Sequence, residues 1–179
     1  MLLNSLSRTV LLSTCAALFL LGVLTSQAAA ASCSGATAAA ASQGVSQHRS
    51  AVLCLVNAQR ARRGLPPLRT SRLLTTAAQR HSRDMVSRHF FAHESLNGAT
   101  VRDRVARTGY LRGAWDIGEN IGWMSAPTAA GIVQAWMESP GHRKMILYRG
   151  FKEAGVGIAA GIPSGGAGAT YTMNFGVAG

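Results

Sequence analysis

Apolar residues recur at helical spacing in the first half of the chain. Across residues 47–63 they fall three and four positions apart, and Gly64 followed by two prolines ends this pattern. A second stripe begins after a capping residue, Thr70 or Ser71, and continues to Arg88. Its inward positions are Leu74, Ala77, Ala78, His81 and Met85. The spacing therefore predicts two amphipathic helices and makes His81 a packed core residue.

Two shorter helices are expected further along the chain. Thr100 is a typical cap for a helix with Val101 and Val105 facing inward, ended by Gly109. Pro127 suits the first turn of another helix, which continues to residue 138. Its inward face would carry Ile132, Ala135 and Trp136. The run Ser139-Pro140-Gly141 is expected to break this helix.

The last thirty residues change to the two-residue period of β-strands. Val156, Ile158 and Ala160 alternate, the run 161–168 is rich in glycine, and alternation resumes over 171–177. This pattern predicts a terminal hairpin. Residues 115–123 fit either a short strand or an ordered loop. With helices first and strands last, the fold class is α+β, an antiparallel sheet covered by helices.

The first thirty residues have the composition of a secretory signal peptide. Arg8 precedes an apolar run over residues 10–24, and small residues follow at 28–31. The run is shorter than the roughly 20 residues of a spanning helix. Residues 31–46, rich in Ala and Ser, are expected to be a linker, and 47–179 the folded domain. We therefore expect an exported protein, extracellular or periplasmic, without a transmembrane segment after cleavage.

Two cysteines, Cys33 and Cys54, would remain in the mature chain. In an oxidising compartment such a pair suggests one disulfide, although two free thiols are the alternative. The three tryptophans, Trp115, Trp123 and Trp136, are interpreted as core anchors.

Basic residues outnumber acidic ones by 18 to 7, which gives a formal net charge of +11. Most of the arginines are expected on a solvated surface, and Arg60, Arg62 and Arg63 suit the C-terminal end of the first helix. The excess charge favours attraction to polyanions such as envelope phosphates or anionic lipid headgroups. Specific nucleic-acid binding is not expected, because no basic helix or platform of stacking aromatics is present.

Six short motifs follow one another between residues 50 and 178. They are Leu55-Val56-Asn57-Ala58-Gln59-Arg60 with Gly64-Leu65-Pro66-Pro67-Leu68; Ala78-Gln79-Arg80-His81-Ser82-Arg83-Asp84-Met85; Phe90-Phe91-Ala92-His93; Gly118-Glu119-Asn120-Ile121; Trp136-Met137-Glu138-Ser139-Pro140-Gly141-His142-Arg143; and Gly155-Val156-Gly157. In this order they resemble the CAP superfamily of cysteine-rich secretory proteins, antigen 5 and pathogenesis-related 1 proteins, in its bacterial branch. The resemblance implies an α-β-α sandwich with a central antiparallel sheet flanked by helices.

The resemblance also implies a cavity lined by two histidines and one or two glutamates, which binds a divalent metal in some members. The motifs assign His93, Glu119 and His142 to these positions, and Glu138 is the candidate for the second glutamate. Two neutral imidazoles and a carboxylate are a ligand set suited to Zn²⁺. Zinc or another divalent metal is thus an expected cofactor, though not an obligatory one. Alternatively, these residues hold the cavity wall through hydrogen bonds alone.

Three functions follow from these observations. The leading one is a binding module for a lipid, a sterol, an envelope component or a protein partner. The second is a metal-dependent hydrolase acting on peptide or envelope material, which requires Glu138 to point into the cavity as a free base. Ser95 and Ser139 lie near the histidines in sequence, but neither stands in a nucleophile-elbow motif. The third is a basic surface protein that binds anionic polymers. Catalysis is left open by the sequence.

Overall fold

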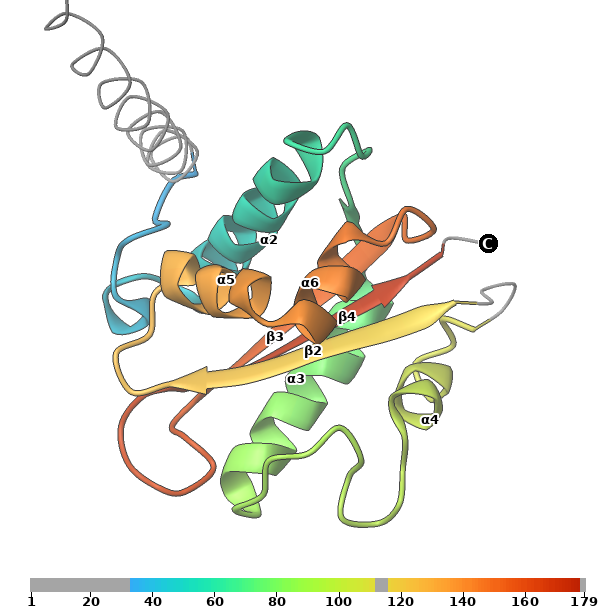
Figure 1. Ribbon diagram of the computed structural model, residues 1–179. Helices are drawn as coiled ribbons and strands as arrows, with labels where there is room; N and C mark the ends of the chain where they lie inside the picture. Colours follow the sequence, from blue (N-terminus) through green and yellow to red (C-terminus); the bar gives the residue numbers. More distant parts are fainter. Residues whose placement is uncertain (1–32, 112–115, 178–179) are drawn as a thin grey trace, which may run out of the picture.

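A computed structural model describes residues 33–111 and 116–177, so the expected signal peptide and Trp115 lie outside the described residues. Helices and strands follow one another along the chain as shown in Figure 1. The elements are η1 (Ala40–Ser42), α2 (Val45–Ala61), β1 (Arg69–Thr70), α3 (Arg72–Ser87), α4 (Val101–Ala106), β2 (Ile117–Met124), α5 (Ala129–Glu138), α6 (Pro140–Leu147), β3 (Glu153–Ala160) and β4 (Ala169–Gly176).

The strands form one sheet in the order β1-β3-β4-β2. β4 pairs antiparallel with β3 and with β2, and the two-residue strand β1 adds a parallel edge to β3. α3 packs against β3 and β4 on one side, while α2, α5 and α6 lie on the other (Figure 1). The expected α-β-α sandwich is confirmed, with β1 as a parallel addition to the antiparallel sheet.

Two glycines of β3 allow α3 to lie directly on the sheet. A Cβ atom on Gly155 would collide with the backbone of Thr75, and one on Gly157 would collide with the backbone of Ala78. Side chains of α3 also bond to this strand. Gln79 Nε2 donates to the Ile158 carbonyl at 2.8 Å, and the Ile158 N–H donates to Gln79 Oε1 at 3.0 Å. This close contact fixes where α3 sits relative to the sheet.

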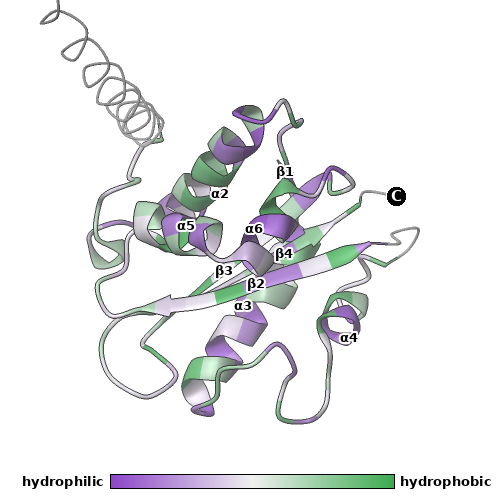
Figure 2. Ribbon diagram, viewed as in Figure 1, coloured by the Kyte–Doolittle hydropathy of each residue, from purple (hydrophilic) through white to green (hydrophobic). Residues whose placement is uncertain are grey.

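The opposite face of the sheet carries the larger hydrophobic core. α2 and α5 carry apolar and polar residues on different sides, as amphipathic helices do (Figure 2). Trp136 is buried, and its Nε1 donates to the Ile121 carbonyl at 3.0 Å.

Two predictions about single side chains can be compared with the structure. His81, on α3, is buried as predicted. The prediction that Trp123 anchors the core is wrong, because 45% of its surface is exposed at the edge strand β2.

Helix α6 begins directly after α5, where the sequence pattern predicted only the end of a helix. Pro140 occupies its first turn, where a proline costs no hydrogen bond because that N–H has no partner within the helix. α6 is tied to α2 by Arg60, which is fully buried and not at the surface. The Arg60 guanidinium donates to the carbonyls of Ile146, Tyr148 and Phe151 at 2.8 to 3.3 Å. Burial lowers the pKa of Arg60 from its ordinary value.

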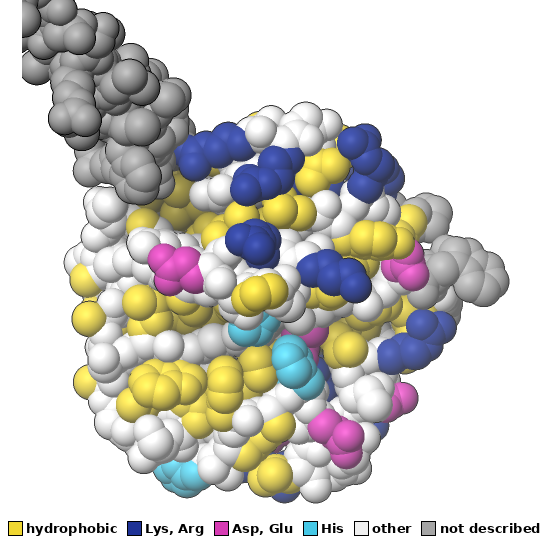
Figure 3. Space-filling view, viewed as in Figure 1, with side chains coloured by type: hydrophobic (Ala, Val, Ile, Leu, Met, Phe, Trp, Pro, Cys, Tyr) yellow, Lys and Arg dark blue, Asp and Glu magenta, His cyan; other side chains and the backbone are white. Residues whose placement is uncertain are grey.

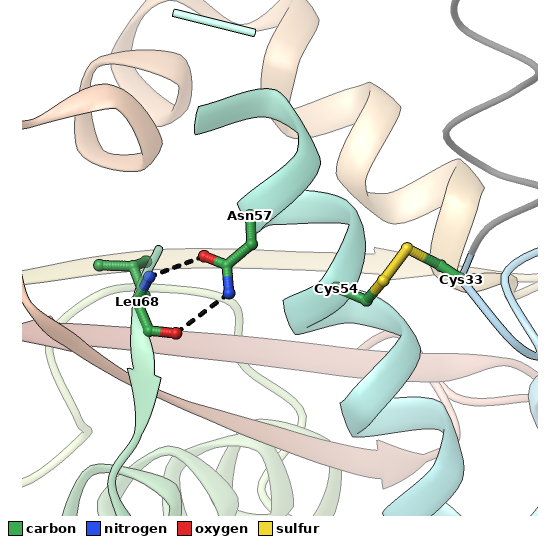
Figure 4. The surroundings of a disulfide bond; sticks show 4 residues. All are labelled: Cys33, Cys54, Asn57 and Leu68. Atoms are coloured by element: carbon green, nitrogen blue, oxygen red, sulfur yellow. Dashed lines mark hydrogen bonds between the residues drawn. A yellow bond between two sulfur atoms is a disulfide. The ribbon is translucent and has the colours of Figure 1, made fainter. Parts of the chain in front are cut away.

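The predicted disulfide between Cys33 and Cys54 is confirmed (Figure 4). It joins α2 to the segment 33–44, which was expected to be a linker. This segment bonds to the start of α5 through Ala40 N–H to the Pro127 carbonyl at 2.9 Å. Ala130 N–H donates to the carbonyl of Ala36 at 2.8 Å. Across residues 33–111 and 116–177, no helix has the length and apolar character needed to cross a bilayer.

The contact between α3 and β3 leads to a stability prediction. Gly157→Ala should lower the free energy of unfolding by about 3 kcal/mol, since the added methyl group meets helix backbone that cannot rotate away. Urea denaturation measures this loss. Gly141→Ala is the matched control, because a Cβ there meets nothing within 4 Å and alanine is the better helix former. Equal stability of the two variants would contradict the close packing of α3 on β3.

Candidate functional site

The centre of the site is the buried carboxylate of Glu119, in the middle of β2. Its Oε2 accepts a hydrogen bond from Arg104 Nη2 at 2.7 Å, and its Oε1 accepts one from His93 Nδ1 at 3.0 Å. Asn174 is its cross-strand partner on β4. With its amide oriented to suit its neighbours, Asn174 donates to Glu119 Oε2 at 3.0 Å and accepts from the Ala78 N–H at 3.2 Å. Both carboxylate oxygens are thus engaged.

Arg104 reaches Glu119 because of how α4 begins. Thr100 and Asp103 form a reciprocal capping box, which fixes the first turn of the helix. Arg104 lies one turn after the cap, where its side chain points inward and is only 7% exposed. Its Nη1 donates to the Ala99 carbonyl at 2.9 Å and to Ser95 Oγ at 3.3 Å. The guanidinium therefore holds the loop before α4 and the carboxylate on β2 together.

The two motif histidines lie at the solvent side of this cluster. The side chain of His93 is 58% exposed, although its Nδ1 contacts Glu119. His142 lies in α6, and its carbonyl accepts a hydrogen bond from Asn120 Nδ2 at 3.0 Å. The pKa of His142 is lowered by burial and, to a smaller extent, by the nearby His93. The two imidazoles are therefore near enough to interact electrostatically, and Figure 3 shows histidine side chains gathered beside a carboxylate on this face.

The chemical capacity of the cluster depends on which atoms stay free. With Nδ1 of His93 donating to Glu119, its Nε2 is available as a ligand atom. A carboxylate behind an imidazole is the usual arrangement that orients a metal-binding histidine. Because both of its oxygens already accept hydrogen bonds, Glu119 is better placed to orient His93 than to bind a metal ion itself. Within the described parts of the chain, no group of three or more His, Cys, Asp or Glu side chains is arranged to hold a metal ion.

The structure does not bring the other candidate residues into this cluster. Glu138 is exposed at the end of α5, and its Oε1 accepts a hydrogen bond from Gln134 Nε2 at 2.9 Å, one turn earlier. This places it as a surface residue and gives it no contact with either histidine. Ser95 accepts from Arg104, and Ser139 precedes α6 as its N-cap residue. Neither serine is bonded to an imidazole in the described structure.

Sequence reasoning missed two residues of the site, Arg104 and Asn174. The sequence did contain a sign of the role of Arg104. This residue precedes Val105, which was predicted to face inward on the helix capped by Thr100. An arginine is usually assigned to the surface, and this assignment hid its role. Asn174 lies on the last strand, where the predicted alternation places Tyr171, Met173 and Phe175 on one face. The two-residue period therefore puts Asn174 on the opposite face of this strand. Both faces of β4 are in fact buried.

Comparisons with known proteins agree with this geometry. The sequence model of the Cysteine-rich secretory protein family (CAP) matches residues 53–175. The uncharacterized protein YkwD of Bacillus subtilis is 33% identical over 139 residues, which are 78% of this chain and 51% of YkwD. The chain thus spans about half the length of this curated relative.

Solved structures show the same fold. An extracellular protein of Bacillus anthracis that contains an SCP domain matches with a TM-score of 0.60 and 28% identity, over 76% of this chain and 44% of that chain. An outer surface protein of Borrelia burgdorferi matches with a TM-score of 0.67 and 15% identity, over 76% of this chain and 97% of its own. At 15% identity the second match concerns the fold alone.

The ion pair between Arg104 and Glu119 can be tested by a double-mutant cycle. Arg104→Met should lower the free energy of unfolding by about 3 kcal/mol, because it leaves a buried carboxylate without its cation. Glu119→Gln in the same chain removes that charge, so the double variant should lose less than the two single variants together. Urea denaturation provides all four values. Arg102→Met, an exposed position on the same helix, is the control and should change stability by less than about 0.5 kcal/mol. Strictly additive losses would refute the coupling.

Proposed function

Since the chain belongs to the cysteine-rich secretory protein (CAP) family, we propose that it is an exported binding module whose histidines, His93 and His142, hold a divalent metal ion. The observation that carries this proposal is the hydrogen bond from His93 Nδ1 to the buried Glu119, which leaves Nε2 of His93 available as a ligand atom. Export is supported by the signal-like residues 1–30 and by the descriptions of similar structures as extracellular or outer-surface proteins.

The donor chemistry favours zinc. Imidazole nitrogens are common zinc ligands, and the lowered pKa of His142 keeps this side chain neutral at pH 7, as a ligand must be. Two protein nitrogens leave further coordination positions for solvent or for an oxygen of a bound partner. A zinc ion there would supply Lewis acidity to such an oxygen. The residues of this chain would hold the ion, orient His93 through Glu119 and keep one side of it open.

Binding is favoured over hydrolysis by the state of the carboxylates. A metal-dependent hydrolase needs a free carboxylate or another base next to the bound water. Both oxygens of Glu119 already accept hydrogen bonds, and Glu138 is paired with Gln134 at the surface. Within the described residues, neither Glu119 nor Glu138 is thus free to act as this base. This arrangement suits recognition of a partner better than activation of water.

The charge of the chain suggests what kind of partner approaches this face. Lys and Arg side chains gather above the histidines in Figure 3, in the part of the surface formed by α2 and α6. A net charge of +11 attracts anions over distances comparable to the Debye length, about 8 Å at physiological salt. We therefore propose that an anionic envelope component or lipid headgroup is the class of ligand that this face meets.

Zinc calorimetry on the protein at pH 7.5 tests the metal site. Zinc should bind with micromolar affinity, and His93→Ala/His142→Ala should weaken this binding at least about ten-fold. Binding should also weaken towards pH 5, because protons compete with a metal ion for imidazole nitrogens. Glu138→Gln is the control and should bind zinc as the wild type does, since Glu138 is exposed and its hydrogen bond is to Gln134.

Two outcomes would overturn the proposal. One is equal zinc affinity of the wild type and the double histidine variant, which would place the metal elsewhere. The other is full retention of zinc at pH 5. Loss of binding in Glu138→Gln would instead move the site to α5 and restore a carboxylate ligand.

A further inference from the structure

A second site shares Arg104 with the cluster around Glu119. It is a pocket of about 310 Å³ between α3, the loop before α4 and α4 itself. Four arginines line it, Arg80, Arg88, Arg104 and Arg107, together with His81 and Asp84. From the sequence, these arginines were expected only on a solvated surface. Their convergence from two helices is visible only in the folded chain.

The inner wall of the pocket contains two buried polar side chains with an unsatisfied nitrogen each. His81 is 1% exposed and donates from Nε2 to the Ala92 carbonyl at 3.0 Å, while its Nδ1 has no hydrogen-bond partner. Arg104 is 8% exposed, and its Nε is also without a partner. Leaving a buried donor or acceptor unpaired costs free energy, because the atom has lost its hydrogen bonds to water. Both residues line the cavity, so its wall is polar and carries the charge of Arg104.

The rim of the pocket carries an excess of positive charge. Asp84 is the one carboxylate among the lining residues, and it lies 3.5 Å from Arg88 in an ion pair. Arg80 and Arg107 are exposed and make no side-chain hydrogen bond or ion pair within the described structure. Since a planar guanidinium matches the oxygens of phosphate and carboxylate groups, converging arginines are typical of an oxyanion site.

We propose that this pocket binds a phosphate group, either free or as a monoester. Arg80, Arg107 and Arg88 would contact its oxygens, and Arg104 and His81 would lie in the wall behind it. A volume of about 310 Å³ has room for a phosphate together with a small esterified group such as glycerol.

This proposal can be tested without a metal ion, because the pocket contains neither His93 nor His142. Calorimetric titration of the metal-free protein at pH 7.5 and moderate salt, first with inorganic phosphate and then with glycerol 3-phosphate, tests it. Arg80→Gln/Arg107→Gln should weaken the binding at least about ten-fold. Both positions are exposed, so the thermal midpoint of this variant should equal that of the wild type.

The matched control is Arg72→Gln/Arg83→Gln, which removes the same charge from exposed positions of α3 that do not line the pocket. It should change the affinity by less than about two-fold. The Arg104 side-chain Nε–H resonance in NMR spectra should shift on titration with either phosphate compound. Tighter binding of the ester assigns the pocket to a phosphate monoester, and equal binding assigns it to the phosphate group alone.

Three results would overturn the proposal. The first is no binding of either compound at millimolar concentration. The second is an equal loss of affinity in the two double variants, which would reduce the effect to general electrostatic attraction. The third is an Arg104 Nε–H signal that stays unchanged at saturation, which would place the phosphate outside the pocket.

Discussion

The buried carboxylate of Glu119 is the constraint on which the arrangement of the site depends. A carboxylate removed from water must be compensated by a cation and by hydrogen-bond donors, or the fold loses several kcal/mol. Arg104, His93 and Asn174 meet this requirement, and they come from α4, from the loop before it and from β4. One anion on β2 therefore holds together α4 with its preceding loop and the strand β4, which lies some seventy residues further along the chain. The position of His93 at the surface is a consequence of this requirement.

Close packing of α3 on the sheet supports the same cluster from behind. Because Gly155 and Gly157 have no side chains, the helix backbone lies against β3, and the Ala78 N–H comes within reach of Asn174. The same approach places His81 behind Arg104, between the helix and the loop before α4. The backbone contact and the polar cluster are thus parts of one arrangement. A change that lifts α3 from β3 would loosen the support of Asn174 as well as the core.

Hydrophobic periodicity predicted much of the fold because most of its helices have one apolar face and its last two strands form a hairpin. It failed where a residue type has two roles. Pro140 ends α5 but also begins α6, and Arg60 lies fully buried among carbonyl groups. His93, Glu119 and His142 were assigned by family resemblance, since intervals of more than twenty residues carry no geometric information. Arg104 escaped both approaches, because only the folded chain shows which carboxylate its guanidinium meets.

Arg104 bonds to Glu119 and also lines the proposed phosphate pocket, so the ligands of the two proposed sites would influence each other. A phosphate next to the guanidinium adds negative charge beside the cation that neutralises Glu119. The electrostatic potential at His93 then becomes more negative, which favours a divalent cation on the imidazoles. By thermodynamic linkage, a bound cation must favour the phosphate by the same factor. The buried ion pair that stabilises the fold would thereby also couple a cation site at the histidines to an anion site in the pocket.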